Sequence, residues 1–291
     1  RFPVGPPINA MKLLRIGKLN QEKPAFIDAD GITRDLSSII QDLNAETINQ
    51  NTLELINKTD LSKLPKLSEN LRIGACVSNS QKFIGIGLNY TDHAEETGMT
   101  IPNEPIIFIK ANSCISGPND NILLPRKSKK TDWEIELGIV IGKKAQYINE
   151  DKSFDHIFGY CIVNDISERE FQIERSGQWD KGKGCDTFGP IGPYLVTKDE
   201  IKEVQNLNLE LKLNGKIMQK GNTNKMIFDV KHLVSYLSHF MTLYPGDIIT
   251  TGTPSGVGMA KKPQIFLKKG DEMILKIDGL GFQKQTVVLN Q

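Results

Sequence analysis

Two glutamates separated by a single residue stand inside an apolar stretch and are the first candidates for chemistry. Glu134 and Glu136 lie within residues 132–142, which show the alternation typical of a buried strand. The alternating apolar residues are Ile135, Leu137, Ile139 and Ile141. Same-face residues on a strand lie roughly 6.5 to 7 Å apart, so both carboxylates can lean onto one point. Because carboxylates in a poorly solvated place repel each other, a divalent cation between them is the simplest compensation.

The rest of that strand face argues against a plain structural explanation of the two acids. A half-exposed edge strand can carry two glutamates toward solvent without any function, but this face continues with Gly138 and Val140. A third ligand would be Asp165, which ends the apolar run 158–165, although it is also a candidate N-cap for a helix from Ile166 onward. Three carboxylates around a hard cation such as Mg²⁺ would leave positions open for water and for a substrate with paired oxygens.

A candidate base precedes the acidic strand. His93 and Glu96 are three residues apart in an expected helical turn, so they share a face. A carboxylate that holds one imidazole nitrogen leaves the other free to activate water. The alternative is the start of a surface helix, capped by Asp92 and with acids favoured in its first turn.

Two glycine-rich segments offer groups that bind anions. Lys183 lies in the loop of residues 178–193 and is a plausible cation for an enolate or a carboxylate, or else an ordinary solvated lysine. Residues 245–258 pass from a strand into a loop with many hydroxyl and backbone N–H donors. Neither this loop nor Gly85-x-Gly87 is a nucleotide motif, because the lysine and the third glycine that such motifs need are missing.

Composition narrows the class of protein. The chain has 291 residues and a formal net charge of +1, without a clustered basic stripe, so neither nucleic acid nor a membrane surface is expected as a partner. No apolar run approaches the roughly 20 residues that span a bilayer. The four cysteines lack paired spacing, which indicates free thiols, a reducing compartment and therefore a cytoplasmic location.

The local patterns predict three parts of the chain. Residues 1–10 are expected to be an added leader before a natural start at Met11, residues 11–75 a small N-terminal domain, and residues 76–291 the catalytic domain. Within these parts we predict a hairpin of residues 12–16 and 25–32 turning at Asp30-Gly31, helices at 36–43, 52–56 and 228–243, and hairpins turning at Asn214-Gly215 and Asp278-Gly279.

Several motifs together resemble the fumarylacetoacetate hydrolase family. Besides the Glu-x-Glu strand they are Asn-Asp-x-Ser-x-Arg-x-x-Gln at 164–172, Gly-Lys-x-x-Asp-Thr-Phe-x-Pro-x-Gly-Pro at 182–193, and Thr-Gly-Thr-Pro-x-Gly-Val-Gly at 251–258. They occur in the family's order over residues 83–289. The start of the chain is similar to members that act as ureidoglycolate lyases or as 2,4-diketo-3-deoxy sugar-acid hydrolases.

The resemblance implies a fold, a cofactor and a role for each candidate residue. The fold would be α+β and β-rich, a mixed β-roll or sandwich like the fumarylacetoacetase C-terminal domain, with a small N-terminal α/β domain. The family implies a homodimer that uses Mg²⁺ or Mn²⁺ on a small 2-keto acid substrate. The implied roles are metal ligands for Glu134, Glu136 and Asp165, a water-activating pair for His93 and Glu96 on a lid segment, an enolate-stabilising cation for Lys183, and substrate contacts for Arg169, Gln172 and Thr253, the last to a carboxylate.

The expected activity is the hydrolysis of a C–C bond in a 2,4-diketo acid, either an acylpyruvate or a 2,4-diketo-3-deoxy sugar acid, to pyruvate and a carboxylic acid. Because His93 and Glu96 are both present, hydrolysis or decarboxylation is favoured over isomerisation. The alternatives are a ureidoglycolate lyase or an oxaloacetate decarboxylase on the same metal site, and a non-catalytic relative that binds sugar acids.

Overall fold

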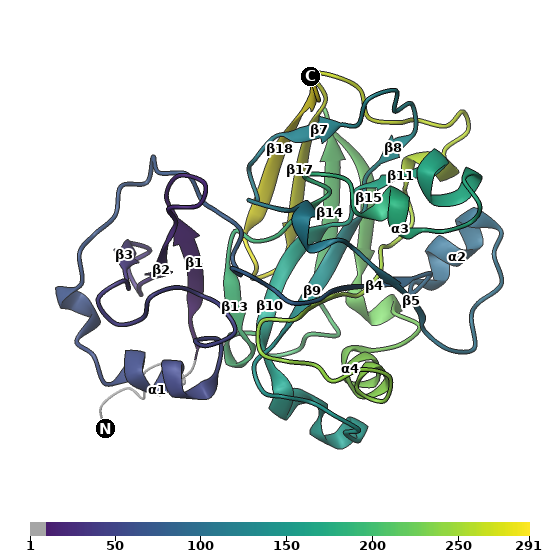
Figure 1. The fold of residues 1–291 in the computed structure, drawn as a ribbon. Helices are drawn as coiled ribbons and strands as arrows, with labels where there is room; N and C mark the ends of the chain where they lie inside the picture. Colours follow the sequence, from purple (N-terminus) through teal and green to yellow (C-terminus); the bar gives the residue numbers. More distant parts are fainter. Residues whose placement is uncertain (1–9) are drawn as a thin grey trace.

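The computed structural model describes residues 10–291. The predicted added leader, residues 1–10, therefore lies outside the described residues except for Ala10. Figure 1 shows a large β-rich body with the N-terminal strands and helix α1 to one side. The mixed, strand-rich α+β fold expected from the sequence is confirmed.

The largest element of the fold is a nine-stranded mixed sheet. β9 and β10 form an antiparallel pair near its centre, and β16, which is antiparallel to β9, pairs in parallel with β4. In spatial order the strands are β3 (Thr33–Asp35), β2 (Lys23–Ile27), β1 (Lys12–Ile16), β13 (Leu195–Thr197), β10 (Ile157–Asn164), β9 (Ile135–Ile141), β16 (Ile248–Thr250), β4 (Phe83–Gly87) and β5 (Ile106–Ile109). The N-terminal strands thus extend the sheet of the main body through the pairing of β1 with β13. The proposed domain boundary near residue 75 stays a prediction.

A five-stranded sheet and two short ladders complete the strands. The five strands are β15 (Lys216–Asn222), β14 (Asn208–Leu213), β17 (Glu272–Ile277), β18 (Phe282–Leu289) and β7 (Ile122–Leu124). The ladders pair β8 (Thr131–Asp132) with β11 (Ser167–Glu168), and β6 (Ile115–Ser116) with β12 (Gly189–Pro190). β14 contacts β9 and β17 contacts β10, so the two large sheets pack together.

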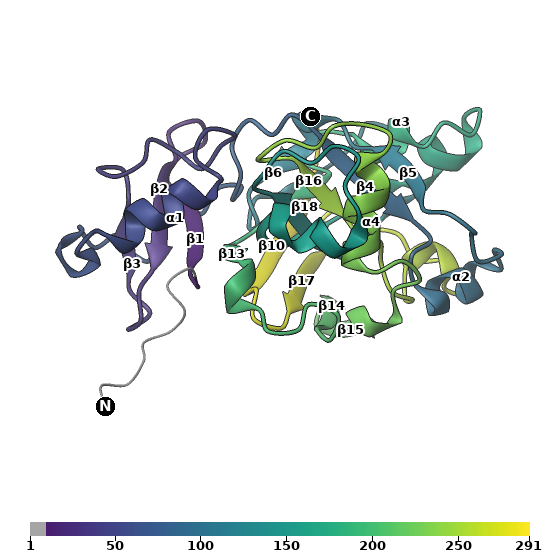
Figure 2. The same ribbon diagram turned by 90° about the horizontal axis from the view of Figure 1, so that it is seen from below.

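Helices are few and short in the described residues. They are α1 (Gln50–Asn57), α2 (Thr91–Thr97), α3 (Asp180–Lys183) and α4 (Val230–Ser238). A π-helical turn spans Glu170–Glu174, and 3₁₀ turns lie at Leu61–Lys63, Asn112–Cys114, Glu150–His156, Lys198–Glu200, Thr223–Lys225 and Gly258–Ala260. α1 accompanies the N-terminal strands, whereas α4 packs on the main body (Figure 2).

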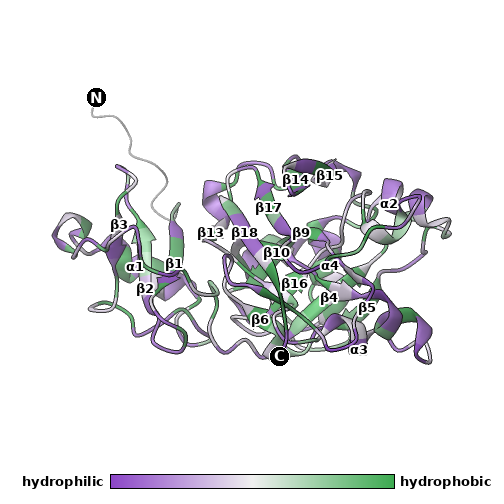
Figure 3. Cartoon of the chain, turned by 90° about the horizontal axis from the view of Figure 1, so that it is seen from above, coloured by the Kyte–Doolittle hydropathy of each residue, from purple (hydrophilic) through white to green (hydrophobic). Residues whose placement is uncertain are grey.

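The hydrophobic core includes residues of both large sheets and continues to α1 and α4. Along β14 every second residue is buried, as expected for a sheet with one face on a core, whereas every residue of β9 and β10 is buried. Figure 3 shows the corresponding hydrophobic colouring of β4, β10 and β16. β9 has hydrogen-bonded neighbours on both sides, so the alternative of a half-exposed edge strand is excluded.

Several local predictions are confirmed and others need correction. The hairpin turns at Asn214-Gly215 and Asp278-Gly279 are present. β1 and β2 form the expected hairpin, but Asp30-Gly31 belongs to the turn between β2 and β3.

The helix predictions were only partly right. Residues 36–43 are not helical. This segment is a series of turns, and the side chains of Leu36 and Leu43 are buried separately from different turns. The helix at 52–56 is confirmed within α1, whereas the helix at 228–243 is shorter than predicted, since α4 ends at Ser238.

Candidate functional site

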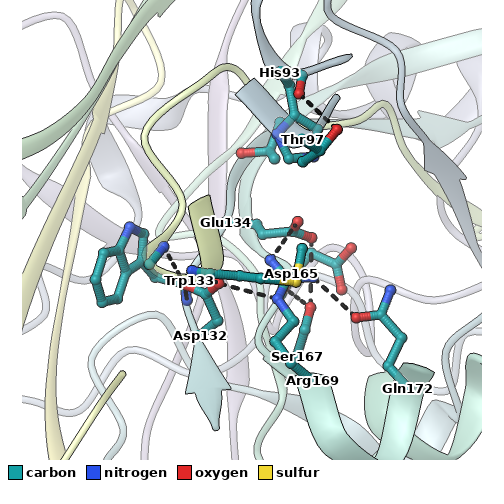
Figure 4. Close-up of polar contacts among 12 residues, drawn as sticks. His93, Thr97, Asp132, Trp133, Glu134, Asp165, Ser167, Arg169 and Gln172 are labelled. Carbon is teal, nitrogen blue, oxygen red and sulfur yellow. Dashed lines mark hydrogen bonds and ion pairs between the residues drawn. The ribbon is translucent and has the colours of Figure 1, made fainter. Parts of the chain in front are cut away.

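The three predicted acidic ligands converge at the junction of β9 and β10. Glu134 directly precedes β9, Glu136 is its second residue, and Asp165 directly follows β10. Because the two strands are antiparallel and Asn164 pairs with Ile135, the start of one strand meets the end of the other. Carboxylate oxygens of the three acids lie within 4.8 Å of one another, and all three residues are buried. Figure 4 shows Glu134 and Asp165 at the centre of this cluster.

The chemistry of this cluster fits a divalent cation. Glu136 Oε1 accepts hydrogen bonds from Thr250 Oγ1 at 2.7 Å and from the Gly252 N–H at 2.9 Å. Within residues 10–291, however, Glu136 forms no ion pair with a lysine or arginine, and burial, followed by the charges of Asp165 and Glu134, raises its pKa well above the ordinary value. A cation bound by the three carboxylates would compensate this charge, and an all-oxygen donor set suits Mg²⁺ or Mn²⁺.

Lys183 places an ammonium group directly on the acidic cluster. Its Nζ lies 2.7 Å from Glu134 Oε1, 3.0 Å from Asp165 Oδ2 and 2.7 Å from Ser167 Oγ. Burial alone would lower the pKa of this lysine, but Asp165 and Glu134 outweigh burial and raise it. The alternative of a solvated loop lysine is therefore wrong: Lys183 is buried and ends the short helix α3, in a segment that was expected to lack regular structure.

A second buried lysine, Lys110, had no role in the sequence predictions. It follows β5 and donates to Asp165 Oδ1 at 2.6 Å and to the carbonyls of Ile166 and Lys183. The only sequence signal is a lysine that ends an apolar run. Asp165 is thus held by two ammonium groups and caps no helix, because the residues that follow it enter β11 instead.

Arg169 links the predicted metal ligand Glu134 to a further buried acid. Its Nη2 lies 3.1 Å from Glu134 Oε2, its Nε 3.0 Å from Asp132 Oδ2, and its Nη1 2.9 Å from Gln172 Oε1. Asp132, which the sequence predictions left without a role, also accepts the N–H groups of Gly258 and Met259. Although burial raises the pKa of Glu134, Lys183 and Arg169 together hold it well below the ordinary value.

The predicted water-activating pair of His93 and Glu96 is assembled on α2. His93 Nδ1 lies 2.8 Å from Glu96 Oε1, and Glu96 Oε2 accepts the Gly256 N–H at 2.8 Å. Asp92 does not cap the helix. Its Oδ2 accepts a hydrogen bond from Ser255 Oγ at 2.8 Å, which ties α2 to the same loop. His93 is only 6% exposed, so this part of α2 is not a plain surface helix.

One cavity of about 170 Å³ joins His93 of the water-activating pair to the acidic cluster. In Figure 4, His93 and Thr97 lie across an open space from Glu134 and Asp165. The predicted site residues that line the cavity are His93, Glu134, Glu136, Arg169, Gln172, Lys183 and Thr253.

Thr253 is less available to a substrate than predicted. Its hydroxyl donates to the Ile135 carbonyl at 2.8 Å and accepts from Gln219 Nε2 at 2.7 Å. The Thr253 hydroxyl proton is therefore already used, and a substrate carboxylate beside this residue would need a different hydrogen-bond donor. The predicted contact between Thr253 and a substrate carboxylate stays a prediction.

Comparison with known proteins assigns the fold to a family. The sequence model described as fumarylacetoacetate (FAA) hydrolase, C-terminal, matches residues 82–288. A protein of Burkholderia ambifaria, whose name gives only a provisional assignment as a hydrolase, is 56% identical over 277 residues, which are 95% of this chain and 98% of the relative. A similarly named protein of Burkholderia multivorans is 55% identical over 276 residues, which are 94% of this chain and 98% of the relative.

Solved structures of proteins that are named for two types of reaction, hydrolysis and isomerisation, share this architecture. The fumarylacetoacetate hydrolase of Exiguobacterium antarcticum has a TM-score of 0.86 and 32% identity, over 96% of this chain and 100% of that one. A protein of Mycobacterium abscessus named as a 2-hydroxyhepta-2,4-diene-1,7-dioate isomerase has a TM-score of 0.83 and 30% identity, over 97% of this chain and 100% of that one. The maleylpyruvate hydrolase of Sphingobium sp. SYK-6, solved with manganese(II) and pyruvate, has a TM-score of 0.81 and 27% identity, over 97% and 100%.

The strand-rich α+β fold thus defines a class of proteins that includes hydrolases and isomerases. This chain belongs to the fumarylacetoacetate hydrolase family. Its members are enzymes, and the acidic cluster has the composition of a site for a divalent metal. In the part of the chain that the structure describes, no helix is both long and apolar enough to cross a bilayer.

Proposed function

We propose that this protein hydrolyses the C3–C4 bond of a 2,4-diketo acid to pyruvate and a carboxylic acid, with Mg²⁺ or Mn²⁺ held by Glu134, Glu136 and Asp165. The observation that carries this proposal is that His93, paired with Glu96, lines the same cavity as Glu134 and Glu136, whose carboxylates cluster with that of Asp165. The related maleylpyruvate hydrolase, named for such a reaction, was solved with manganese(II) and pyruvate.

The cation would supply Lewis acidity and a chelation point for the 2-keto acid end of the substrate. Among the protein's own residues, His93 acts first, as the base. When Nδ1 carries its proton and donates to Glu96, the other ring nitrogen, Nε2, is free to take a proton from water as the water oxygen bonds to C4. Glu96 stabilises the resulting imidazolium and is itself oriented by the Gly256 N–H.

Bond cleavage leaves an electron pair that the site must stabilise. As the C3–C4 bond breaks, this pair stays on C3 as the enolate of pyruvate, which then takes up a proton to give pyruvate. The buried ammonium of Lys183, beside Glu134 and Asp165, is the positive group available for the developing charge. Arg169 and Gln172 line the same cavity and would orient the substrate.

The test is steady-state pyruvate release from acylpyruvates and 2,4-diketo-3-deoxy sugar acids, with Mg²⁺ or Mn²⁺ and with chelator. Ureidoglycolate and oxaloacetate belong in the panel because the same site could serve a lyase or a decarboxylase. Pyruvate release that chelator abolishes is the expected result. If no diketo acid gave pyruvate but ureidoglycolate or oxaloacetate were turned over, the proposed hydrolysis would be contradicted.

The isomerase reaction is the rival from the structural neighbours. Isomerisation of a dienoate needs proton transfer but no attack by water. His93→Ala should therefore abolish pyruvate release if the imidazole activates water. The matched control is His232→Ala, because His232 also pairs with a glutamate, Glu150 at 2.6 Å, but lies on α4 outside the cavity.

A further inference from the structure

The end of the cavity away from the carboxylates is apolar. Besides the polar site residues, the lining includes two aromatic rings and several aliphatic or thioether side chains. They are Ile86, Leu88, Met99, Phe108, Ile173, Trp179 and Met259. Met99 and Ile173 are about half exposed, which places this end at the mouth of the cavity.

Two aromatic side chains form a wall of this apolar end. The rings of Phe108 and Trp179 lie 5.7 Å apart at 54°. Gly87 leaves room for the indole, because a Cβ on this residue would lie only 2.7 Å from a ring carbon of Trp179. Gly85 leaves room for Phe108 in the same way, which gives the Gly85-x-Gly87 pair a steric role. The Lys183 ammonium lies 4.7 Å from the centre of the Phe108 ring, so the wall begins next to the reacting end.

No lysine or arginine of the cavity lining is left to bind a second carboxylate. Arg169 is bound to Asp132, Glu134 and Gln172, and Lys183 is bound to Glu134, Asp165 and Ser167. Both cations therefore lie beside the predicted metal ligands, at the end of the cavity that is proposed to hold the 2-keto acid.

The lysine of an adjoining depression is also paired. Lys130 lines an adjoining depression that shares Arg169, Ile173 and Met259 with the cavity, and its ammonium lies 2.8 Å from Glu174. A carboxylate at the far end of a substrate would thus lose water without gaining a free cation.

We infer that the wall of Phe108 and Trp179, with Met99, Ile173 and Met259, selects substrates whose acyl group is uncharged and ends in apolar carbon. Dicarboxylates of the same length are rejected. This selection differs from that of a maleylpyruvate hydrolase, whose named substrate carries a second carboxylate. The inference rests on the proposed function, because it assumes that the 2-keto acid end lies at Glu134, Glu136 and Asp165.

Binding of matched ligands tests the inference apart from turnover. 2-Oxohexanoate and 2-oxoadipate have six carbons each and differ only in a terminal methyl or carboxylate. Calorimetry on the full chain with Mn²⁺ is expected to show 2-oxohexanoate binding at least about tenfold more tightly. Equal or tighter binding of 2-oxoadipate, or no binding of 2-oxohexanoate, would overturn the inference. Preferred binding of 2-oxohexanoate without pyruvate release from any diketo acid would refute the proposed function and leave the apolar selection standing.

A charge-introducing variant tests the position of the selecting group. Ile173→Lys places an ammonium at the mouth and should raise kcat/KM for an acylpyruvate with a terminal carboxylate at least about fivefold relative to its uncharged analogue. Ile217→Lys is the matched control, because Ile217 is 46% exposed against 47% for Ile173 but lies on β15, away from the cavity lining. An unchanged ratio in Ile173→Lys, or the same change in the control, would contradict the assignment of this wall.

Discussion

Replacement of Lys110 by methionine should destabilise the protein far more than an average lysine substitution. Lys110 is fully buried, and its Nζ donates to Asp165 Oδ1 at 2.6 Å and to the carbonyls of Ile166 and Lys183. Methionine nearly preserves the volume of the side chain but removes all three donors. Two buried carbonyls then lose a partner, and Asp165 keeps only Lys183 as an ion-pair partner.

The size of the effect follows from the burial of both partners. Removing one member of a buried ion pair typically costs about 3 to 5 kcal/mol, because the remaining charge stays desolvated. With a urea m-value of about 3 kcal/mol/M, such a loss would lower the unfolding midpoint by roughly 1 to 1.7 M. The metal-free protein is the proper sample, since a cation bound at the carboxylates would partly replace the missing charge.

Urea unfolding in chelator, followed by tryptophan fluorescence, measures this shift. Lys12→Met is the matched control, because Lys12 also pairs with an acid, Glu200 at 2.7 Å, but the two side chains are 34% and 27% exposed. The control should lose about 1 kcal/mol or less. An Lys110→Met midpoint within 0.3 M of the control, a limit of roughly 1 kcal/mol at that m-value, would refute the idea that this lysine neutralises the cluster.

Three further results are expected. His93→Ala should lower kcat for pyruvate release by about 10² to 10⁴, the usual contribution of a general base, whereas His232→Ala should stay near the wild-type rate; equal rates for both variants would exclude the imidazole as the base. Glu136→Gln should abolish Mn²⁺ binding in calorimetry and raise the thermal stability of the metal-free protein, because it removes a buried carboxylate without an ion-pair partner; retained binding would refute its role as a ligand. Burial raises the pKa of Asp247 above 3.8, so the wild type should lose stability relative to Asp247→Asn as the pH rises through that raised pKa; a pH-independent difference in midpoint would contradict this sign.

Local signals explain which elements were predictable. The Asn214-Gly215 hairpin was found because both residues adopt positive φ, which asparagine and glycine tolerate best. The alternation in β9 likewise identified a strand from neighbouring residues alone. The predicted helix at 36–43 failed because buried Leu36 and Leu43 have helical spacing, yet each occupies its own place in the core from a turn.

The candidate site was predictable to the extent that its residue types are unusual for their surroundings. Glu134 and Glu136 stood out as acids in a strand of buried apolar residues. Lys110 and Asp132 did not, since a lysine that ends an apolar run and an acid near a strand start are ordinary features of a surface. Their importance comes from burial beside Asp165 and Arg169, which no local pattern reports.

The sequence by itself determined the local conformations, the family motifs and the set of groups that could do chemistry. Only the tertiary structure decided which of these groups meet. Antiparallel pairing of β9 with β10 brings Glu136 to Asp165, and the hydrogen bonds of α2 to the loop at Gly256 bring His93 to the same cavity. Such contacts join residues up to 163 positions apart. They form because burying both sheet faces and hydrogen-bonding the buried charged groups selects one arrangement among many that the local sequence permits.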